Sequence, residues 1–362
     1  MKLNAECKAK LKELQEMSQA IGERPDYVQG RSGNTSVKLD DSLMAIKASG
    51  HRLTDISDEA GFAIVKYPEI YAFFDENDPD DFPDLEKAGT DIVMDNVVTL
   101  AGEEIRPSVG TGFHSQLKKY VIHSHSVYMN VATCANEGIG LVTRLFLDED
   151  YDWLWLPYHN PGVRLAFMIE RALRKHYSRR ETVPQMIALQ NNGMIVHADT
   201  MEECMEIHER AQAKLIKRFR IKEDYPEIKL EKADDKLYRS ATEGLTDMLD
   251  EKDWSEKVLM EDILYPDQYA YLADNLAFTD EAGAAPVPGK ALLNSRDKTI
   301  LYAMNKGKAT AIEQTIVAVL FILRTMKSNR MTPRLMDDSA KAFMGNWESE
   351  KYRRLLLDLD NN

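Results

Sequence analysis

The feature that limits the fold of this chain most is a short strand pattern ending in two alternating histidines. Residues 120–125 read YVIHSH, so β-branched residues precede His123 and His125. Side chains two positions apart on a strand point to the same face of a sheet, and the two imidazoles therefore converge. Such a pair suits a zinc-like divalent cation, which takes nitrogen ligands at about 2.0–2.1 Å. The alternative is two polar histidines on a half-exposed strand.

Three short segments rich in small residues are candidates for anion binding. They are residues 32–36 (SGNTS), residues 47–50 (KASG) and residues 106–108 (RPS). Small residues allow backbone N–H groups to approach an anion closely, and the hydroxyl groups add donors. Each segment alone is better explained as an ordinary turn. Together, with Lys47 and Arg106 beside two of them, they predict one phosphate pocket.

Net charge and composition narrow the partners that we expect. The 362 residues include 46 basic and 60 acidic side chains, giving a net charge of -14, which disfavours binding to nucleic acid. The three cysteines are far apart and show no ligand spacing, which favours a reducing compartment. The longest apolar run, residues 316–323, is too short to span a bilayer and indicates a buried helix. We therefore expect a cytoplasmic protein without a membrane segment.

Hydrophobic periodicity divides the chain into an α/β part and a second part of different composition. Helical spacing is found in residues 5–21, 163–177 and 200–220, and strand patterns in residues 34–38, 43–47, 120–125, 186–190 and 194–197. The acidic segment 75–86 is typical of an exposed loop. Beyond residue 225 we expect a charged helical segment (225–260), a weak strand, and helices near 308–326, 333–343 and 346–358.

Five motifs occur in an order that resembles the class II aldolase/adducin family. They are SGNTSVKLDDSLMAIKASG, RPSVGTGFHSQL, VIHSHS, LPYHNPGVRLA and ALQNNGMIVHADTMEECMEIHERA. This family includes fuculose- and rhamnulose-phosphate aldolases and a ribulose-phosphate epimerase, and the KASG form is most similar to the rhamnulose-phosphate branch. The resemblance covers roughly residues 5–220. It implies a three-layer α/β/α domain with a mainly antiparallel central sheet over residues 1–225, followed by a mostly helical extension over residues 226–362, and a homotetramer.

The resemblance also implies roles for individual residues. Those that match the phosphate-binding positions of the family are Gly33, Asn34, Ser49, Gly50 and Ser108. His123 and His125 match its first two metal ligands, so the resemblance strengthens the case for a divalent metal, with zinc favoured. The expected ligand is a phosphorylated sugar.

Two positions depart from the family pattern. Gly110 stands where family aldolases carry the acid that moves the proton at the enediolate carbon, and glycine cannot transfer a proton. Asn192 stands where the third metal-binding histidine is usual, and its amide oxygen is a poorer zinc ligand than imidazole. His159 or His197 is a candidate replacement ligand. Glu103 and Glu104 are weaker candidates for the missing base.

These observations leave three hypotheses about function. The first is a metal-dependent carbon–carbon lyase (aldolase) or epimerase acting on a sugar phosphate. The second is another metal-dependent reaction on the same scaffold, such as decarboxylation or isomerisation, because the acid is missing at Gly110. The third is a non-catalytic, adducin-like binding protein, because both Gly110 and Asn192 depart from the pattern. For the extension, we expect Trp347 to pack in the core, with a subunit contact as the alternative.

Overall fold

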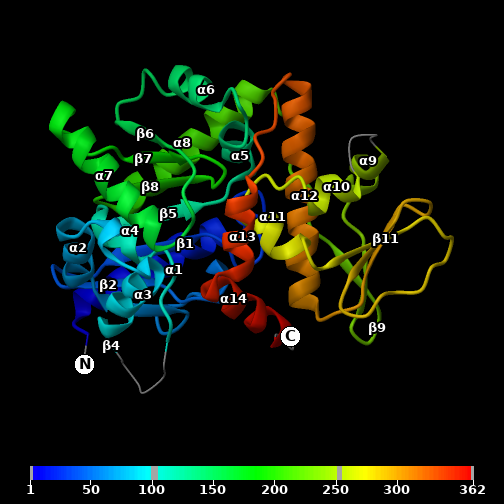
Figure 1. Cartoon of the computed structure of the whole chain (residues 1–362), viewed down its shortest axis with the longest axis horizontal. Coiled ribbons are helices and arrows are strands. Elements are labelled where there is room, and N and C mark those ends of the chain that lie inside the picture. Colours follow the sequence, from blue (N-terminus) through cyan, green and yellow to red (C-terminus); the bar gives the residue numbers. More distant parts are fainter. Residues whose placement is uncertain (1–2, 99–104, 251–254, 360–362) are drawn as a thin grey trace.

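The structure is a computed structural model that describes residues 3–98, 105–250 and 255–359. An eight-stranded sheet forms its centre (Figure 1). In spatial order the strands are β4 (Val97–Val98), β3 (Phe62–Lys66), β2 (Leu43–Lys47), β1 (Asn34–Lys38), β5 (Tyr120–Ser124), β8 (Met194–Ala198), β7 (Met186–Leu189) and β6 (Trp153–Leu156). Every pair is antiparallel except β6 and β7, which run parallel. The mainly antiparallel sheet is thus confirmed.

Successive apolar side chains of β5 point to opposite faces of the sheet, which explains why both faces are covered. Tyr120 and Ile122 pack into one hydrophobic cluster, whereas Val121 packs into a second one on the opposite face. The first face is covered by α1 (Ala5–Gly22), α5 (Val127–Thr133), α6 (Gly138–Leu145) and α8 (Met201–Phe219). The second is covered by α2 (Tyr67–Glu76), α3 (Leu85–Asp95), α4 (Thr111–Gln116) and α7 (Val163–Arg180). These are the three layers that the resemblance implies.

The acidic segment 75–86 is more ordered than the loop that we predicted. It contains the end of α2, the short 3-10 helix η2 (Pro79–Asp81) and the start of α3; a second 3-10 helix, η1 (Leu53–Asp55), precedes β3. The side chain of Asp78 caps η2 and that of Asp84 caps α3 by accepting backbone N–H bonds. Some of the acidic residues in this segment therefore serve as helix caps.

The C-terminal part combines helices with a second sheet. The helices are α9 (Leu245–Asp250), α10 (Glu256–Met260), α11 (Pro266–Leu272), α12 (Lys306–Ser328), α13 (Asp338–Asn346) and α14 (Glu348–Leu359). The five strands are, in order, β11 (Leu276–Thr279), β12 (Ala291–Asn294), β13 (Thr299–Tyr302), β10 (Leu237–Ser240) and β9 (Leu230–Asp234). The prediction of helix throughout residues 225–260 was wrong, because β9 and β10 form a hairpin there.

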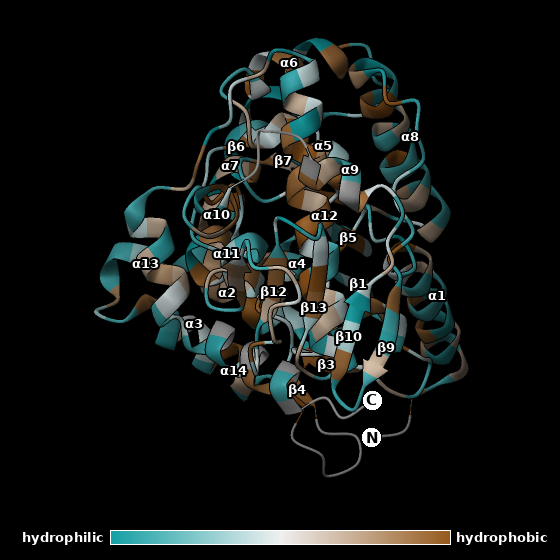
Figure 2. Cartoon of the chain, turned by 90° about the vertical axis from the view of Figure 1, so that its right-hand side faces the viewer, coloured by the Kyte–Doolittle hydropathy of each residue, from teal (hydrophilic) through white to brown (hydrophobic). Residues whose placement is uncertain are grey.

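The long helix α12 joins the two parts of the molecule. It lies between the large sheet and the small one (Figure 1), and its apolar residues continue the hydrophobic cluster that contains α1, α5 and α8. By length and composition α12 is apolar enough to cross a membrane, but 78% of its apolar window is buried inside the fold. Figure 2 shows α12 as a largely hydrophobic helix enclosed by other elements.

Candidate active site

One pocket at the end of β5 collects most of the residues that the sequence singled out. Eight of the residues that line it were predicted as site residues: Gly33, Asn34, Ser49, Gly50, Ser108, His123, His125 and Asn192. The three small-residue segments and the histidine pair therefore face one cavity. Pro266 and Asp267 from α11, and Met344 and Trp347 at the end of α13, close it from the other side.

Close packing of the first segment brings Asn34 to the pocket. Gly33 has a φ of +67°, and a Cβ atom there would lie 2.6 Å from a methyl group of Val28 and 3.0 Å from the carbonyl oxygen of His123. Next along the chain, the side-chain oxygen of Asn34 is 2.5 Å from Nε2 of His114, and Nδ1 of His114 is 2.6 Å from the hydroxyl of Ser36.

These contacts fix what Asn34 offers to a ligand. Burial lowers the pKa of His114 well below its usual value, so the ring is neutral and carries one N–H. The carbonyl oxygen of Asn34 can only accept, so Nε2–H of His114 donates to it and Nδ1 accepts from the hydroxyl of Ser36. With its oxygen engaged, Asn34 has its amide NH₂ as the group it can offer to an anion. Sequence reasoning missed His114.

Two cationic side chains line the pocket. Lys47 at the end of β2 is only 3% exposed, and its ammonium group donates to the carbonyl oxygen of Arg31 at 2.7 Å. Arg31 itself is the second cation of the lining. Arg106, which the sequence placed beside the pocket, instead lies over the ring of Tyr352, 5.1 Å from its centroid, and lines an adjoining cavity. Positive charge in a mostly buried cavity favours an anionic ligand.

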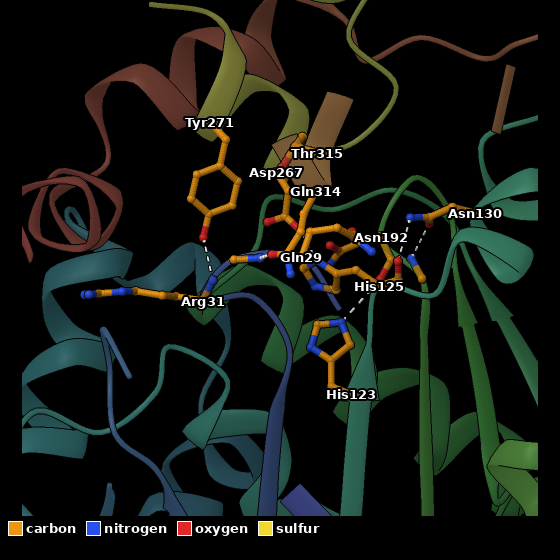
Figure 3. A network of polar contacts seen from close by, with 12 residues as sticks. Gln29, Arg31, His123, His125, Asn130, Asn192, Asp267, Tyr271, Gln314 and Thr315 are labelled. Carbon is orange, nitrogen blue, oxygen red and sulfur yellow. Dashed lines mark hydrogen bonds and ion pairs between the residues drawn. The ribbon is translucent and has the colours of Figure 1, made fainter. Parts of the chain in front are cut away.

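The two histidines lie side by side on the pocket wall. Their ring centroids are 4.8 Å apart, and both side chains are buried. The pKa of His123 is lowered to about 3, mainly by burial and secondly by the nearby His125. His123 is therefore neutral near neutral pH. Nε2 of His123 lies 3.3 Å from the backbone carbonyl oxygen of Asn192, and Nδ1 of His125 is bonded to Oδ2 of Asp267 (Figure 3).

This donor set fits a divalent cation through its two imidazoles. Neutral imidazole is the form that binds metal ions, and His123 is held in that form by burial. Within the described ranges no group of three His, Cys, Asp or Glu side chains is arranged to hold a metal. Asp267, the acid nearest to the pair, is hydrogen-bonded to Nδ1 of His125. The remaining positions around an ion would fall to ligand oxygens or water.

The turn that carries Asn192 is fixed from both sides. Gly193 has a φ of +70°, and its N–H donates to the side-chain oxygen of Asn130 at 2.9 Å. A Cβ atom at Gly193 would lie 2.1 Å from the carbonyl oxygen of Ser124, so the turn packs directly on β5. The side-chain amide of Asn191 donates to two carbonyl oxygens of the C-terminal part. This is why the backbone of Asn192 comes close to His123.

The remaining candidates lie elsewhere. Gly110 precedes α4, and a Cβ atom there would lie 2.9 Å from Oδ1 of Asn34 and 2.8 Å from the ring of Phe113, so the position has little room for a carboxylate. His159 is half-buried outside the pocket lining. His197 is buried on β8, where its Nδ1 accepts the N–H of Lys118 at 3.4 Å. The pocket lining includes neither histidine. Glu103 and Glu104 lie outside the described residues.

Comparison with known proteins identifies the scaffold. Residues 12–213, more than half of the chain, match the Class II Aldolase and Adducin N-terminal domain. The chain belongs to this family. The family resemblance seen in the five ordered motifs is thereby confirmed.

Part of the chain is also similar to solved structures of class II aldolase proteins. The N-terminal class II aldolase domain of a conserved protein from Thermoplasma acidophilum is 25% identical, with 57% of this chain and 92% of that chain covered and a TM-score of 0.48. A sugar-phosphate aldolase from Thermotoga maritima is 14% identical, with coverages of 60% and 97% and a TM-score of 0.38. An L-fuculose 1-phosphate aldolase from Glaciozyma antarctica PI12 is 13% identical, with coverages of 60% and 76% and a TM-score of 0.38. No curated protein matches the chain.

In this class II aldolase family member, the C-terminal part supplies residues that sequence reasoning missed. Asp267 contacts His125 across 142 positions of sequence. Trp347, which we expected in the core, is 7% exposed and also lines the pocket. No local pattern in residues 264–268 (LYPDQ) assigns Asp267 to the site.

Proposed function

We propose that the chain is a metal-dependent carbon–carbon lyase or epimerase that acts on a phosphorylated sugar. The observation that carries this proposal is the convergence of the three small-residue segments and the pair His123 and His125 on one pocket, which also holds Lys47 and Arg31. An anion-binding region next to two neutral imidazoles suits a ligand with a phosphate at one end and a carbonyl or hydroxyl group at the other.

The phosphate would be held by this chain's own donors. Gly33 and Gly50 allow backbone N–H groups to come close, while Ser49 and Ser108 add hydroxyl donors and Lys47 adds charge. This anchoring would orient the reacting carbon toward the histidines and lower the entropic cost of reaction. His123 and His125 would hold the divalent cation, with zinc favoured. When bound, such an ion would act as a Lewis acid that polarises a carbonyl group and stabilises an enediolate.

One observation favours a second candidate function. The position of the family acid is Gly110, and its surroundings are filled by Phe113 and Asn34. A protein that keeps the phosphate-binding segments without this acid would suit non-catalytic binding of a phosphorylated ligand. It would also suit another metal-dependent reaction on this scaffold, such as decarboxylation or isomerisation.

Metal analysis followed by an activity screen tests the proposal. Gently purified protein should contain a divalent metal, and a retro-aldol and epimerase screen over ketose phosphates should reveal turnover. His123→Ala should abolish both metal retention and turnover. His159→Ala is the matched control, because His159 lies outside the pocket lining, and it should leave both unchanged. Absence of bound metal in the wild type would reject the proposal. Metal retention with no turnover across the screen would favour the binding function.

We extend the proposal to the assembly of the chain as a homotetramer, as the family resemblance implies. Light scattering coupled to size-exclusion chromatography measures this directly. A monomer would contradict this extension without affecting the proposed chemistry.

A further inference from the structure

The carboxylate in the pocket comes from outside the matched family domain. Among the described residues that line the pocket, Asp267 is the one Asp or Glu. It is 1% exposed and lies in the first turn of α11, directly after Pro266. The family match ends at residue 213, so this acid belongs to the C-terminal part of the chain.

Several hydrogen bonds hold the start of α11 in place. The side chain of Gln268 accepts the backbone N–H of Leu264 at 2.8 Å and donates to the carbonyl oxygens of Val258 and Leu259. Because both ends of this amide are engaged inside the fold, the residue next to it has little freedom to move.

The same helix is tied to the first anion-binding segment. The hydroxyl oxygen of Tyr271 on α11 accepts the backbone N–H of Arg31 at 2.9 Å (Figure 3). Gln314 on the neighbouring α12 accepts the backbone N–H of Gly30 at 2.8 Å. The helix that carries Asp267 is therefore fixed to a loop of the pocket as well as to His125.

The contact between Asp267 and His125 has a defined chemical consequence. An ionised carboxylate can only accept hydrogen bonds, so Nδ1 of His125 carries the proton that is shared with Oδ2 of Asp267. In a neutral imidazole the other nitrogen, Nε2, then carries the lone pair. A carboxylate behind a histidine sets the tautomer and the orientation of the ring in this way at many metal sites.

We propose that Asp267 is a positioning residue that holds His125 as the Nδ1–H tautomer, with Nε2 as the nitrogen that binds a divalent cation. The C-terminal part of the chain thereby completes a metal site whose histidines both lie in the N-terminal domain. This inference rests on the proposed function, since it concerns the same site.

The tautomer of His125 is measured first, on metal-free full-length protein. Long-range proton–nitrogen correlation spectra of nitrogen-15-labelled histidines distinguish the two neutral tautomers and the imidazolium ion, and the His125→Gln variant assigns the signal. Spectra are recorded at about 1.5 pH units above the usual histidine pKa of about 6.5. We expect the Nδ1–H pattern in the wild type and its loss in Asp267→Ala. An Nε2–H or imidazolium pattern in the wild type would overturn the inference.

Cation affinity is measured second, by titrating full-length protein with Co²⁺ and following its absorption bands. Asp267→Ala and the similarly sized Asp267→Asn should weaken binding by about 10- to 100-fold. The control is Asp280→Asn, which removes an exposed acid from the same part of the chain and should leave affinity unchanged. Thermal unfolding of each variant confirms that it is folded.

The two measurements separate this inference from the proposed function. If the wild type binds no Co²⁺, the metal-dependent function fails, while the spectra still decide whether Asp267 sets the tautomer. If the wild type binds Co²⁺ and both Asp267 variants bind it equally well, the role of Asp267 is overturned and the proposed function stands.

Discussion

Replacement of Lys47 by methionine is the most direct test of the anion pocket. Lys47 is 3% exposed at the end of β2, and its ammonium group is fixed by a 2.7 Å bond to the carbonyl oxygen of Arg31. Methionine retains most of the apolar stem but removes the charge and the donors. If the pocket binds phosphate, the variant should lose affinity without losing the fold.

The expected loss of phosphate affinity follows from the hydrogen bonds that this buried cation can donate. A hydrogen bond to a charged group contributes about 1.5–3 kcal/mol, and each 1.4 kcal/mol changes the dissociation constant tenfold. Lys47→Met should therefore weaken phosphate binding by about 10- to 150-fold. Because the ammonium group is largely shielded from solvent, added salt should reduce this difference only slightly.

The assay is isothermal titration calorimetry of the full chain with inorganic phosphate. Lys38→Met is the matched control, because Lys38 also donates from a strand end to a backbone carbonyl oxygen, that of Leu117, but lies outside the pocket lining. The control should bind phosphate like the wild type. A change of less than about threefold in a folded Lys47→Met protein would refute the assignment of Lys47 to anion binding.

Three further predictions concern the scaffold around the pocket. Gly193→Ala should lower the free energy of unfolding, measured in urea, by about 2–5 kcal/mol, because left-handed backbone strain is combined with a clash against the carbonyl oxygen of Ser124. The control Gly244→Ala has the left-handed backbone but open space around it, and it should lower the free energy of unfolding by only about 1–2 kcal/mol. Gly110→Glu should lower the melting temperature and should not raise retro-aldol turnover above the wild-type level, because the position has no room for the carboxylate. A gain of turnover would instead indicate a decayed aldolase. Burial lowers the pKa of His197 to about 3 in the folded chain, against about 6.5 in the unfolded chain. Between these pH values the unfolded chain binds one more proton at His197. This residue therefore lowers the free energy of unfolding by about 1.4 kcal/mol for each pH unit of acidification. Because His123 and His114 also have lowered pKa values, the unfolding curves of His197→Gln should keep a slope over that range that is smaller than the wild-type slope by this amount.

Local patterns were sufficient to predict much of the N-terminal domain. The predicted strands at 34–38 and 43–47 correspond to β1 and β2, and the predicted helix at 200–220 corresponds to α8, which is capped by Thr200. In α8 one face is buried, so the period of its apolar residues reports the helix directly. β1 and β2 are buried on both faces, and their short length and the polar residues 40–42 between them are the local signals.

The hairpin of β9 and β10 shows where such patterns fail. The β9 sequence LEKAD is exposed at nearly every position, and its charges alternate with no apolar face. Without a buried face, a charged edge strand and a charged helix have the same composition, and periodicity cannot separate them. The hairpin is instead held by backbone pairing of β10 with β13, which comes about sixty residues later in the chain.

The pocket contains residues with a local sequence signal and residues that only distant packing brings there, so only part of it was predictable. His123 and His125 converge because of strand geometry, and Gly33 and Gly193 are needed where backbones pack closely, so these residues are visible in a short stretch of sequence. Asp267 has no such local signature, since it becomes a pocket residue only when the fold brings the start of α11 to His125. The family match therefore covers residues 12–213, whereas the residues that form the pocket extend to Trp347. It follows that substitutions in α11 and α13 should affect ligand or metal binding as directly as substitutions in the matched domain, although they lie outside it.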